Sequence, residues 1–184
     1  MEFEANIILK LQSIFNGQIA INFFKIITYM GSYVGIGILF FVLLPKDKRF
    51  SIIYLVTSIL SAVVNYLIKI LIDRPRPYVS FMQIKNYLEA MGTSMPSSHS
   101  MIAGIFLIFS IFAINKFIQN KNLSKPLKFM VGLIIILVLL SRMVLGQHYI
   151  SDILVGLSLG IIVSLLTIKF VYINKKVVIN KQKQ

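Results

Sequence analysis

The sequence contains no cysteine, and this absence excludes disulfide bonds, thiolate metal sites and a cysteine nucleophile. Charged residues are scarce, since they make up 14% of the 184 residues, against about 25% in soluble domains. Acidic residues number only 6 against 19 Lys and Arg, which gives a formal net charge of +13. Histidine occurs twice, as His99 and His148, so any imidazole chemistry must use these two side chains.

The apolar content is high for so short a chain. Hydrophobic residues make up 57% of it, above the roughly 45–50% of soluble proteins, and the mean hydropathy is +0.84. Positive charge gathers in short loops and in the C-terminal tail, and no basic stripe alternates with aromatic residues. The pattern predicts a membrane protein without a nucleic-acid partner, and the length allows one domain over residues 1–184.

Five apolar segments are long enough to cross a bilayer as helices, which takes about 20 residues each. They cover residues 23–44, 52–72, 100–118, 127–145 and 150–173. We therefore expect an all-α fold, an integral membrane helical bundle with about five transmembrane helices.

The first 17 residues form a separate and weaker element. Apolar residues recur there at helical spacing, and the polar residues fall mostly on the other side of the helix. The apolar set is Phe3, Ile7, Ile8, Leu11, Ile14 and Phe15. Because the segment is too short to span a membrane, residues 1–17 are predicted to form an interfacial amphipathic helix. Packing of this helix against the bundle is the alternative.

Loop charges predict the orientation of the spans. Lys and Arg concentrate between spans one and two, between spans three and four, and in the tail of residues 174–184. These three regions alternate onto one side, which the distribution of positive charge assigns to the cytoplasm. The connection of residues 73–99 and the short turn at Gly146 then lie at the outer face of the cytoplasmic membrane.

Polar residues border the long connection between spans two and three. Lys69 lies about one turn inside the end of span two, and Arg76 follows between two prolines. Ser97, Ser98 and His99 open span three, where free backbone N–H groups and the helix dipole favour a bound anion. Lysine and arginine suit the oxygens of phosphate. Anchoring of the cations at the interface and plain helix capping are the alternatives.

A third cluster joins spans four and five. Arg142 lies near the end of span four, and His148 and Asp152 are four residues apart, so that on a helix they share one face. A carboxylate bound to one imidazole nitrogen leaves the other nitrogen free to attack. A structural ion pair between helices is the alternative. The three clusters together supply two histidines, three cations and one carboxylate, the groups that metal-free phosphoryl transfer requires.

These clusters resemble the sequence blocks of the type 2 phosphatidic acid phosphatase superfamily, in its bacterial membrane branch of lipid phosphate phosphatases. The first block is Lys, six residues and Arg-Pro, and the third is Ser-Arg, five residues, His, three residues and Asp. Both match in full, whereas the second block, Pro-Ser-Gly-His, matches except at its glycine. The matching residues are Lys69, Arg76, Pro77, Pro96, Ser97, His99, Ser141, Arg142, His148 and Asp152.

The resemblance implies a role for each matched side chain. His148 would be the nucleophile that forms a phosphohistidine, Asp152 would orient it, and His99 would be the general acid for the leaving group. Phosphate binding would fall to Lys69, Arg76, Ser97 and Arg142. Neither a metal nor another cofactor would be needed.

Two residues depart from the family pattern. Ser98 stands at the position of the family glycine, which lets the backbone approach the phosphate closely. We expect Ser98 at the phosphate site, where it either crowds the substrate or donates an additional hydroxyl. Arg74 is an additional cation beside the first block, and its charge and proximity suggest a contact to a second phosphate.

The leading hypothesis is a metal-independent lipid phosphatase that hydrolyses a phosphomonoester or pyrophosphate on a lipid of the surrounding bilayer. Family analogy gives four candidate substrates: undecaprenyl pyrophosphate, phosphatidylglycerol phosphate, phosphatidic acid and lipid A 1-phosphate. The small outer loop favours the polyprenyl and glycerolipid candidates. A lipid-to-lipid phosphotransferase that uses the same phosphohistidine, and a non-catalytic membrane binding protein, are the alternatives.

Overall fold

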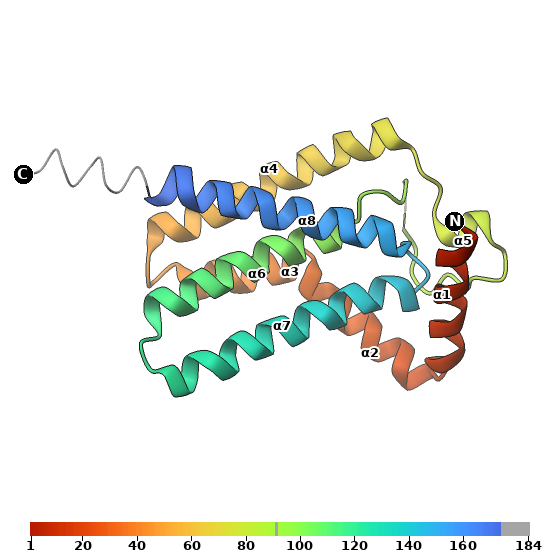
Figure 1. Cartoon of the computed structure of the whole chain (residues 1–184), viewed down its shortest axis with the longest axis horizontal. Helices are drawn as coiled ribbons and strands as arrows, with labels where there is room; N and C mark the ends of the chain where they lie inside the picture. Colours follow the sequence, from red (N-terminus) through yellow and green to blue (C-terminus); the bar gives the residue numbers. More distant parts are fainter. Residues whose placement is uncertain (91, 174–184) are drawn as a thin grey trace, which may run out of the picture.

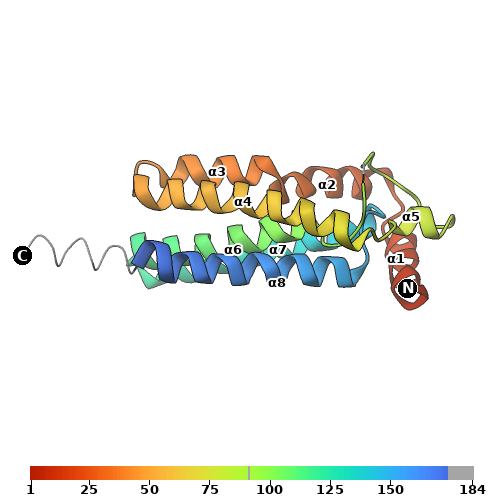
Figure 2. The same cartoon turned by 90° about the horizontal axis from the view of Figure 1, so that it is seen from above.

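A computed structural model of the chain describes residues 1–90 and 92–173. Six helices lie in two layers, and the N-terminal helix, α1, crosses one end of the bundle (Figure 1, Figure 2). One layer contains α2 (Gln18–Thr28), α3 (Tyr33–Leu43) and α4 (Lys48–Ile72). The other contains α6 (Ser98–Phe117), α7 (Lys121–Val144) and α8 (Ile150–Thr167). The tail of residues 174–184, predicted to be basic and cytoplasmic, lies outside the described residues.

The expectation of an all-α membrane bundle is confirmed. Within the described residues, four segments are long and apolar enough to cross a membrane: Lys48–Ser80, Ser98–Phe117, Lys121–Val144 and Ile150–Ile173. The last of these continues from α8 into a π-helix, η2 (Ile168–Ile173). A fifth crossing comes from α2 and α3 together, so the count of five spans holds if this bent pair is one span.

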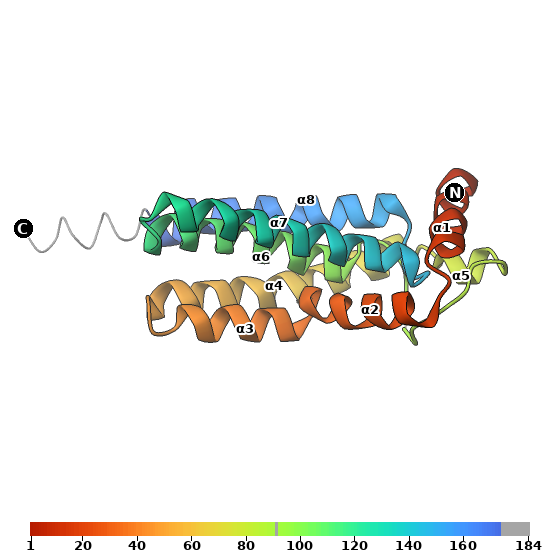
Figure 3. The ribbon, with the colours of Figure 1, turned by 90° about the horizontal axis from the view of Figure 1, so that it is seen from below.

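The first span is broken, where the sequence predicted one continuous helix over residues 23–44. Helix α2 ends at Thr28, a 3-10 turn (η1, Tyr29–Gly31) follows, and the two helices meet at a bend of 52° (Figure 3). Ser32 has an extended backbone, and its side chain caps α3 by accepting a hydrogen bond from the Val34 N–H. A Cβ atom on Gly31 would lie 2.5 Å from the Val138 side chain, so the break packs directly against α7.

Helices α6 and α8 pack closely because glycines line their contact. A Cβ atom on Gly160 would lie 2.1 Å from the Met101 carbonyl oxygen, and one on Gly156 would lie 2.4 Å from that of Ser97. Only glycine lets two helix backbones approach so closely. This contact brings the first turn of α6 beside the first turn of α8.

Helix α1 (Glu2–Ile14) packs on the end of the bundle through one face. Ala5 and Ile8 are buried in a small cluster with Ile84 and Tyr149. Gln12, predicted from its polarity to lie away from the packed face, is buried and hydrogen-bonded to the carbonyl oxygens of residues 85 and 144. Apolar side chains such as Phe3 remain exposed on the outer side of α1. The alternative of packing against the bundle therefore holds for the inner face of this helix.

Candidate active site

The predicted site residues gather at the end of the bundle that α1 crosses. The last turns of α4 and α7 carry Lys69 and Arg142, and the first turns of α6 and α8 carry His99 and Asp152. His148 lies in the connection between α7 and α8, with 2% of its surface exposed, and Asp152 is completely buried. No three His, Asp or Glu side chains among the described residues are placed to share a metal ion.

His148 and Asp152 face each other across the start of α8. His148 Nδ1 lies 3.6 Å from Asp152 Oδ2. His148 precedes α8 and is not on the helix, because the backbone turns at Gly146, which has a φ of +74°. Asp152 caps this helix, since its Oδ2 accepts a hydrogen bond from the Tyr149 N–H at 2.8 Å. His148 and Asp152 therefore lie close together as expected. They do not share one face of a helix, however, because His148 lies in the turn before α8 and Asp152 lies in its first turn.

Ser94 completes the surroundings of this pair, and the sequence reading missed it. Its hydroxyl donates to Asp152 Oδ2 at 2.5 Å and lies 3.4 Å from His148 Nδ1. Ser94 is completely buried, and its own N–H donates to the Arg74 carbonyl oxygen at 2.7 Å. It lies among small polar residues of an irregular loop, where the sequence has no periodic pattern that would predict a buried position.

Burial lowers the pKa of His148 to about 3. The Asp152 carboxylate opposes this shift, whereas the positive charges of Arg142, Arg76 and Lys69 lower the pKa further. The imidazole is therefore neutral near neutral pH, and one ring nitrogen has its lone pair available for attack.

Arg142 presents a partly unused guanidinium to a small cavity. Its Nη1 donates to the Thr28 hydroxyl at 2.6 Å. Among the described residues, no acceptor lies within hydrogen-bond distance of its buried Nε. The cavity beside it has a volume of about 200 Å³ and is lined also by Tyr29, His99 and Gln147. A buried N–H without an acceptor is costly, so this corner favours an anion that can accept it.

Lys69 and Arg76 hold the loop that covers the site. Lys69 Nζ donates to the carbonyl oxygens of Thr93 at 2.7 Å and Ser94 at 3.1 Å. Arg76 donates from Nε to the Gly92 carbonyl oxygen at 2.9 Å and from Nη1 to the side chain of Gln147 at 3.2 Å. Both cations act electrostatically on His148 and both hold this loop, and their binding of phosphate stays a prediction.

The serines at the start of α6 have different partners. Ser97 is the N-cap of α6, and its hydroxyl accepts a hydrogen bond from the Ser100 N–H. Ser98 Oγ accepts one from Asn65 Nδ2 of α4 at 2.8 Å. His99 follows in the same turn and interacts electrostatically with Arg142 and His148. Ser98 Oγ is the acceptor in this contact with α4, so a hydrogen bond donated by its hydroxyl to phosphate stays a prediction.

Arg74, the predicted contact to a second phosphate, binds side chains of the protein. Its guanidinium donates to Asp152 Oδ1 at 2.6 Å and to Glu4 Oε2 at 2.8 Å, and it lies over the Tyr149 ring at 4.1 Å. Two protein carboxylates therefore engage this guanidinium, and a contact of Arg74 to a second phosphate stays a prediction. Glu4 and Thr28 belong to none of the three sequence blocks, but both bind arginines of the site.

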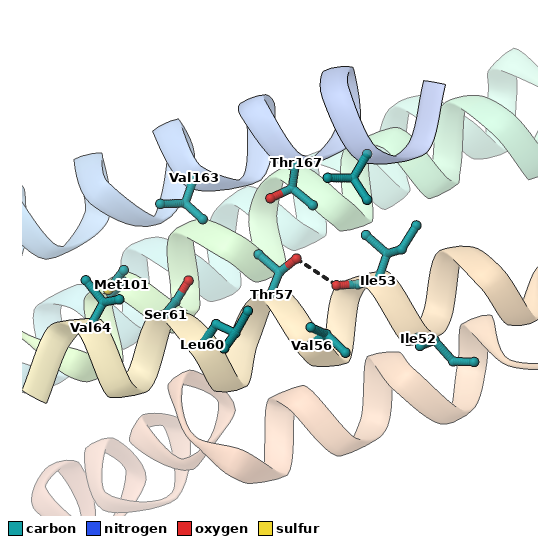
Figure 4. A pocket seen from close by; sticks show the side chains of 11 residues that line it. Ile52, Ile53, Val56, Thr57, Leu60, Ser61, Val64, Met101, Val163 and Thr167 are labelled. Atoms are coloured by element: carbon teal, nitrogen blue, oxygen red, sulfur yellow. Dashed lines mark hydrogen bonds between the residues drawn. The ribbon is translucent and has the colours of Figure 1, made fainter. Parts of the chain in front are cut away.

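A groove runs along the membrane-facing side of the bundle between α4 and α8 (Figure 4). Its volume is about 340 Å³, and its lining is almost entirely apolar. Val64 and Met101 line it toward the site; they lie in α4 and α6, the helices that also carry Lys69 and His99. The groove therefore extends from the neighbourhood of the site between two of the spans.

Comparison with known proteins gives two curated relatives, both from Bacillus subtilis (strain 168). The chain is 32% identical to undecaprenyl-diphosphatase BcrC over 115 residues, which are 62% of this chain and 54% of BcrC. It is 30% identical to phosphatidylglycerophosphatase B over 99 residues, which are 53% of this chain and 46% of that protein. The chain thus spans about half the length of the curated relatives it matches.

Solved structures share the fold, and two of them match most of this chain. The crystal structure of a transmembrane PAP2 type phosphatidylglycerolphosphate phosphatase from Bacillus subtilis has a TM-score of 0.77 at 22% identity, over 92% of this chain and 85% of that one. Aquifex aeolicus LpxE has a TM-score of 0.71 at 20% identity, over 87% and 93% of the two chains. The sequence model of the PAP2 superfamily matches residues 50–176, which contain all three predicted blocks. This match covers well over half of the chain, and the chain therefore belongs to the PAP2 superfamily.

Proposed function

We propose that this protein is a lipid phosphatase that works through a phosphohistidine at His148. The observation that carries the proposal is the set of groups around the small cavity. A second histidine lines this cavity together with a buried arginine whose Nε has no acceptor in the part of the chain that the structure describes. A neutral histidine paired with a carboxylate lies beside them. This combination suits in-line displacement at a phosphorus atom held by fixed cations.

In the first step, Nε2 of His148 attacks the phosphorus and the bond from phosphorus to the leaving oxygen breaks. Asp152 and Ser94 lie at Nδ1, so they hold the ring with Nε2 as the attacking atom and stabilise the positive charge that forms on it. His99, which must be protonated for this step, gives its proton to the leaving oxygen. Arg142, Arg76 and Lys69 balance the charge on the phosphoryl oxygens.

In the second step, water attacks the phosphorus of the phosphohistidine and the bond from phosphorus to nitrogen breaks. His99, now neutral, takes the proton from the water. Inorganic phosphate leaves, and both histidines return to their starting states. The lipid product is an alcohol if the substrate is a phosphomonoester, and a lipid monophosphate if it is a pyrophosphate.

The groove between α4 and α8 supports a lipid as the substrate. Its apolar walls suit a hydrocarbon chain (Figure 4), and Val64 and Met101 line it on the helices that also carry Lys69 and His99. The names of the curated relatives, an undecaprenyl-diphosphatase and a phosphatidylglycerophosphatase, favour undecaprenyl pyrophosphate and phosphatidylglycerol phosphate among the four candidates. The positive charge of the loops at the opposite end supports a site at the outer face of the cytoplasmic membrane.

The test is release of phosphate by the protein purified in detergent with a chelator present, on a panel of the four candidate lipids. We expect release from at least one lipid and none from His148→Ala. Because phosphohistidine is labile in acid, the intermediate is trapped by rapid quenching at alkaline pH. Release that persists in His148→Ala would contradict this nucleophile. Turnover that appears only after an acceptor lipid is added would favour phosphotransfer over hydrolysis.

A further inference from the structure

Helix α1 reaches the paired His148 and Asp152 through one side chain. Glu4 Oε2 accepts a hydrogen bond from Arg74 Nη2 at 2.8 Å, and Arg74 Nη1 donates to Asp152 Oδ1 at 2.6 Å. The second oxygen of Glu4 accepts from the Ser151 N–H at 2.8 Å, in the first turn of α8. The Glu4 carboxylate thus binds both Arg74 and the helix that carries Asp152.

These contacts are sheltered from solvent. The side chains of Arg74 and Glu4 are each 15% exposed, and that of Asp152 is not exposed at all. Burial raises the pKa of Glu4, but hydrogen bonds from Ser151 and Arg74 outweigh it and leave the pKa below its ordinary value. Glu4 is therefore ionised near neutral pH, and charged hydrogen bonds at such a place fix geometry strongly.

The position of α1 is set independently of Glu4. Gln12, two turns further along, donates to the carbonyl oxygens of Lys85 and Val144 and accepts from the Lys85 N–H. Ala5 and Ile8 pack between these two polar anchors, against Ile84 and Tyr149. Contacts other than those of Glu4 therefore fix α1 in a position that places the Glu4 carboxylate beside Arg74.

Negative and positive side chains alternate in the order Glu4, Arg74, Asp152 and, once it is phosphorylated, His148. Asp152 must keep enough negative charge to stabilise a positive His148, but a single arginine on its Oδ1 draws that charge away. Glu4 neutralises the far side of the same guanidinium, so that Arg74 can orient Asp152 without competing fully with His148 for it.

We propose that Glu4 is a positioning residue for the reaction, acting through Arg74 on Asp152 and hence on His148. The inference rests on the proposed function, since it concerns the step that His148 carries out. Glu4 lies too far along this row of contacts to touch the phosphate, so it acts on the rate of phosphohistidine formation and leaves lipid binding unchanged.

The test compares Glu4→Gln and Glu4→Asp with Glu2→Gln, which changes an exposed acid of the same helix turn. Each protein is assayed on the lipid that the wild type hydrolyses, with kcat and KM measured separately. Loss of a charged hydrogen bond predicts a fall in kcat of about 10-fold for Glu4→Gln, with KM within about 2-fold. Glu4→Asp keeps the charge and should recover part of the loss, and Glu2→Gln should match the wild type.

A second arm asks whether Glu4 acts through Arg74. In an Arg74→Met background, Glu4→Gln should cause little further loss, because the connection is already broken. Additive losses, or a change in KM alone, would overturn the proposal, as would an unchanged kcat for Glu4→Gln. A wild type that is inactive on the whole panel would instead defeat the proposed function, and this inference with it.

Discussion

Arg142 Nη1 donates a hydrogen bond to the hydroxyl of Thr28 at 2.6 Å, and this contact joins the third sequence block to the break in the first span. Thr28 is the last residue of α2, next to the 3-10 turn. Both side chains are buried. The bend of the first span thus has a consequence for the site, because it orients the guanidinium of Arg142, a residue that lines the cavity together with His99.

Replacement of Thr28 by valine should lower the catalytic efficiency, because Arg142 would bind the phosphate group less well. Valine has the same shape but no hydroxyl, so Arg142 loses an acceptor and its orientation. We expect kcat/KM to fall by about 10-fold, equivalent to about 1.4 kcal/mol. Thr28→Ser keeps the hydroxyl and is the matched control, with activity near that of the wild type. Equal activity of the valine and serine variants would show that this hydrogen bond does not position Arg142.

Replacement of Gly160 by alanine should separate α6 from α8. The added methyl group meets the Met101 backbone at 2.1 Å, and overpacking of this kind costs about 1–3 kcal/mol. We expect a lower Tm in detergent and a lower kcat, since His99 and Asp152 lie on the two helices. Gly132→Ala on α7 is the control, because its methyl group would meet nothing within 4 Å. A Gly160 variant as stable as the Gly132 variant would contradict the close contact.

Acid should destabilise the protein partly through His148. Its pKa in the folded protein is about 3, below the ordinary 6.5, so the unfolded chain binds this proton first. The stabilisation is therefore complete above pH 6.5 and is lost as the pH falls toward 3. The pKa of Asp47 is also lowered, from 3.8 to about 2, because hydrogen bonds from Lys116 and Tyr172 outweigh its burial, so its contribution is lost only at more acidic pH.

The measurement for this prediction is Tm in detergent at about pH 7 and about pH 5, for the wild type and His148→Asn. We expect the wild-type Tm to fall over this range and the variant to lose less. A variant whose Tm falls as steeply as that of the wild type would mean that His148 is not held neutral by the fold.

Filling the groove should affect long lipids selectively. Val64 lines it toward the site, so Val64→Phe would block a hydrocarbon chain there (Figure 4). We expect kcat/KM for a long-chain lipid to fall by about 5-fold, or about 1 kcal/mol, with no change for a short-chain soluble analogue. Val63→Phe is the control, since Val63 is exposed and does not line the groove. Equal losses on both substrates would argue against the groove as the binding place of the lipid chain.

The sequence by itself determined the helical class, the approximate spans and the polar groups that gather at one end of the bundle. Apolar runs of this length can satisfy their backbone hydrogen bonds in a membrane only as helices or closed barrels, and their length suits helices. Lys69, His99, Arg142 and Asp152 fall near span ends in the sequence, and alternation of the spans brings those ends to one face. These features follow from the lengths of the apolar runs and from the positions of polar residues near their ends.

The tertiary structure decided which groups bind one another. Glu4 meets Arg74 across 70 residues, Ser94 meets Asp152 across 58, and Thr28 meets Arg142 across 114. No local period encodes such contacts, because each depends on how α1, the 92–97 loop and the bent first span pack on the bundle. The same packing makes Arg74 a partner of two carboxylates, because α1 and the start of α8 bring Glu4 and Asp152 to its partly buried guanidinium.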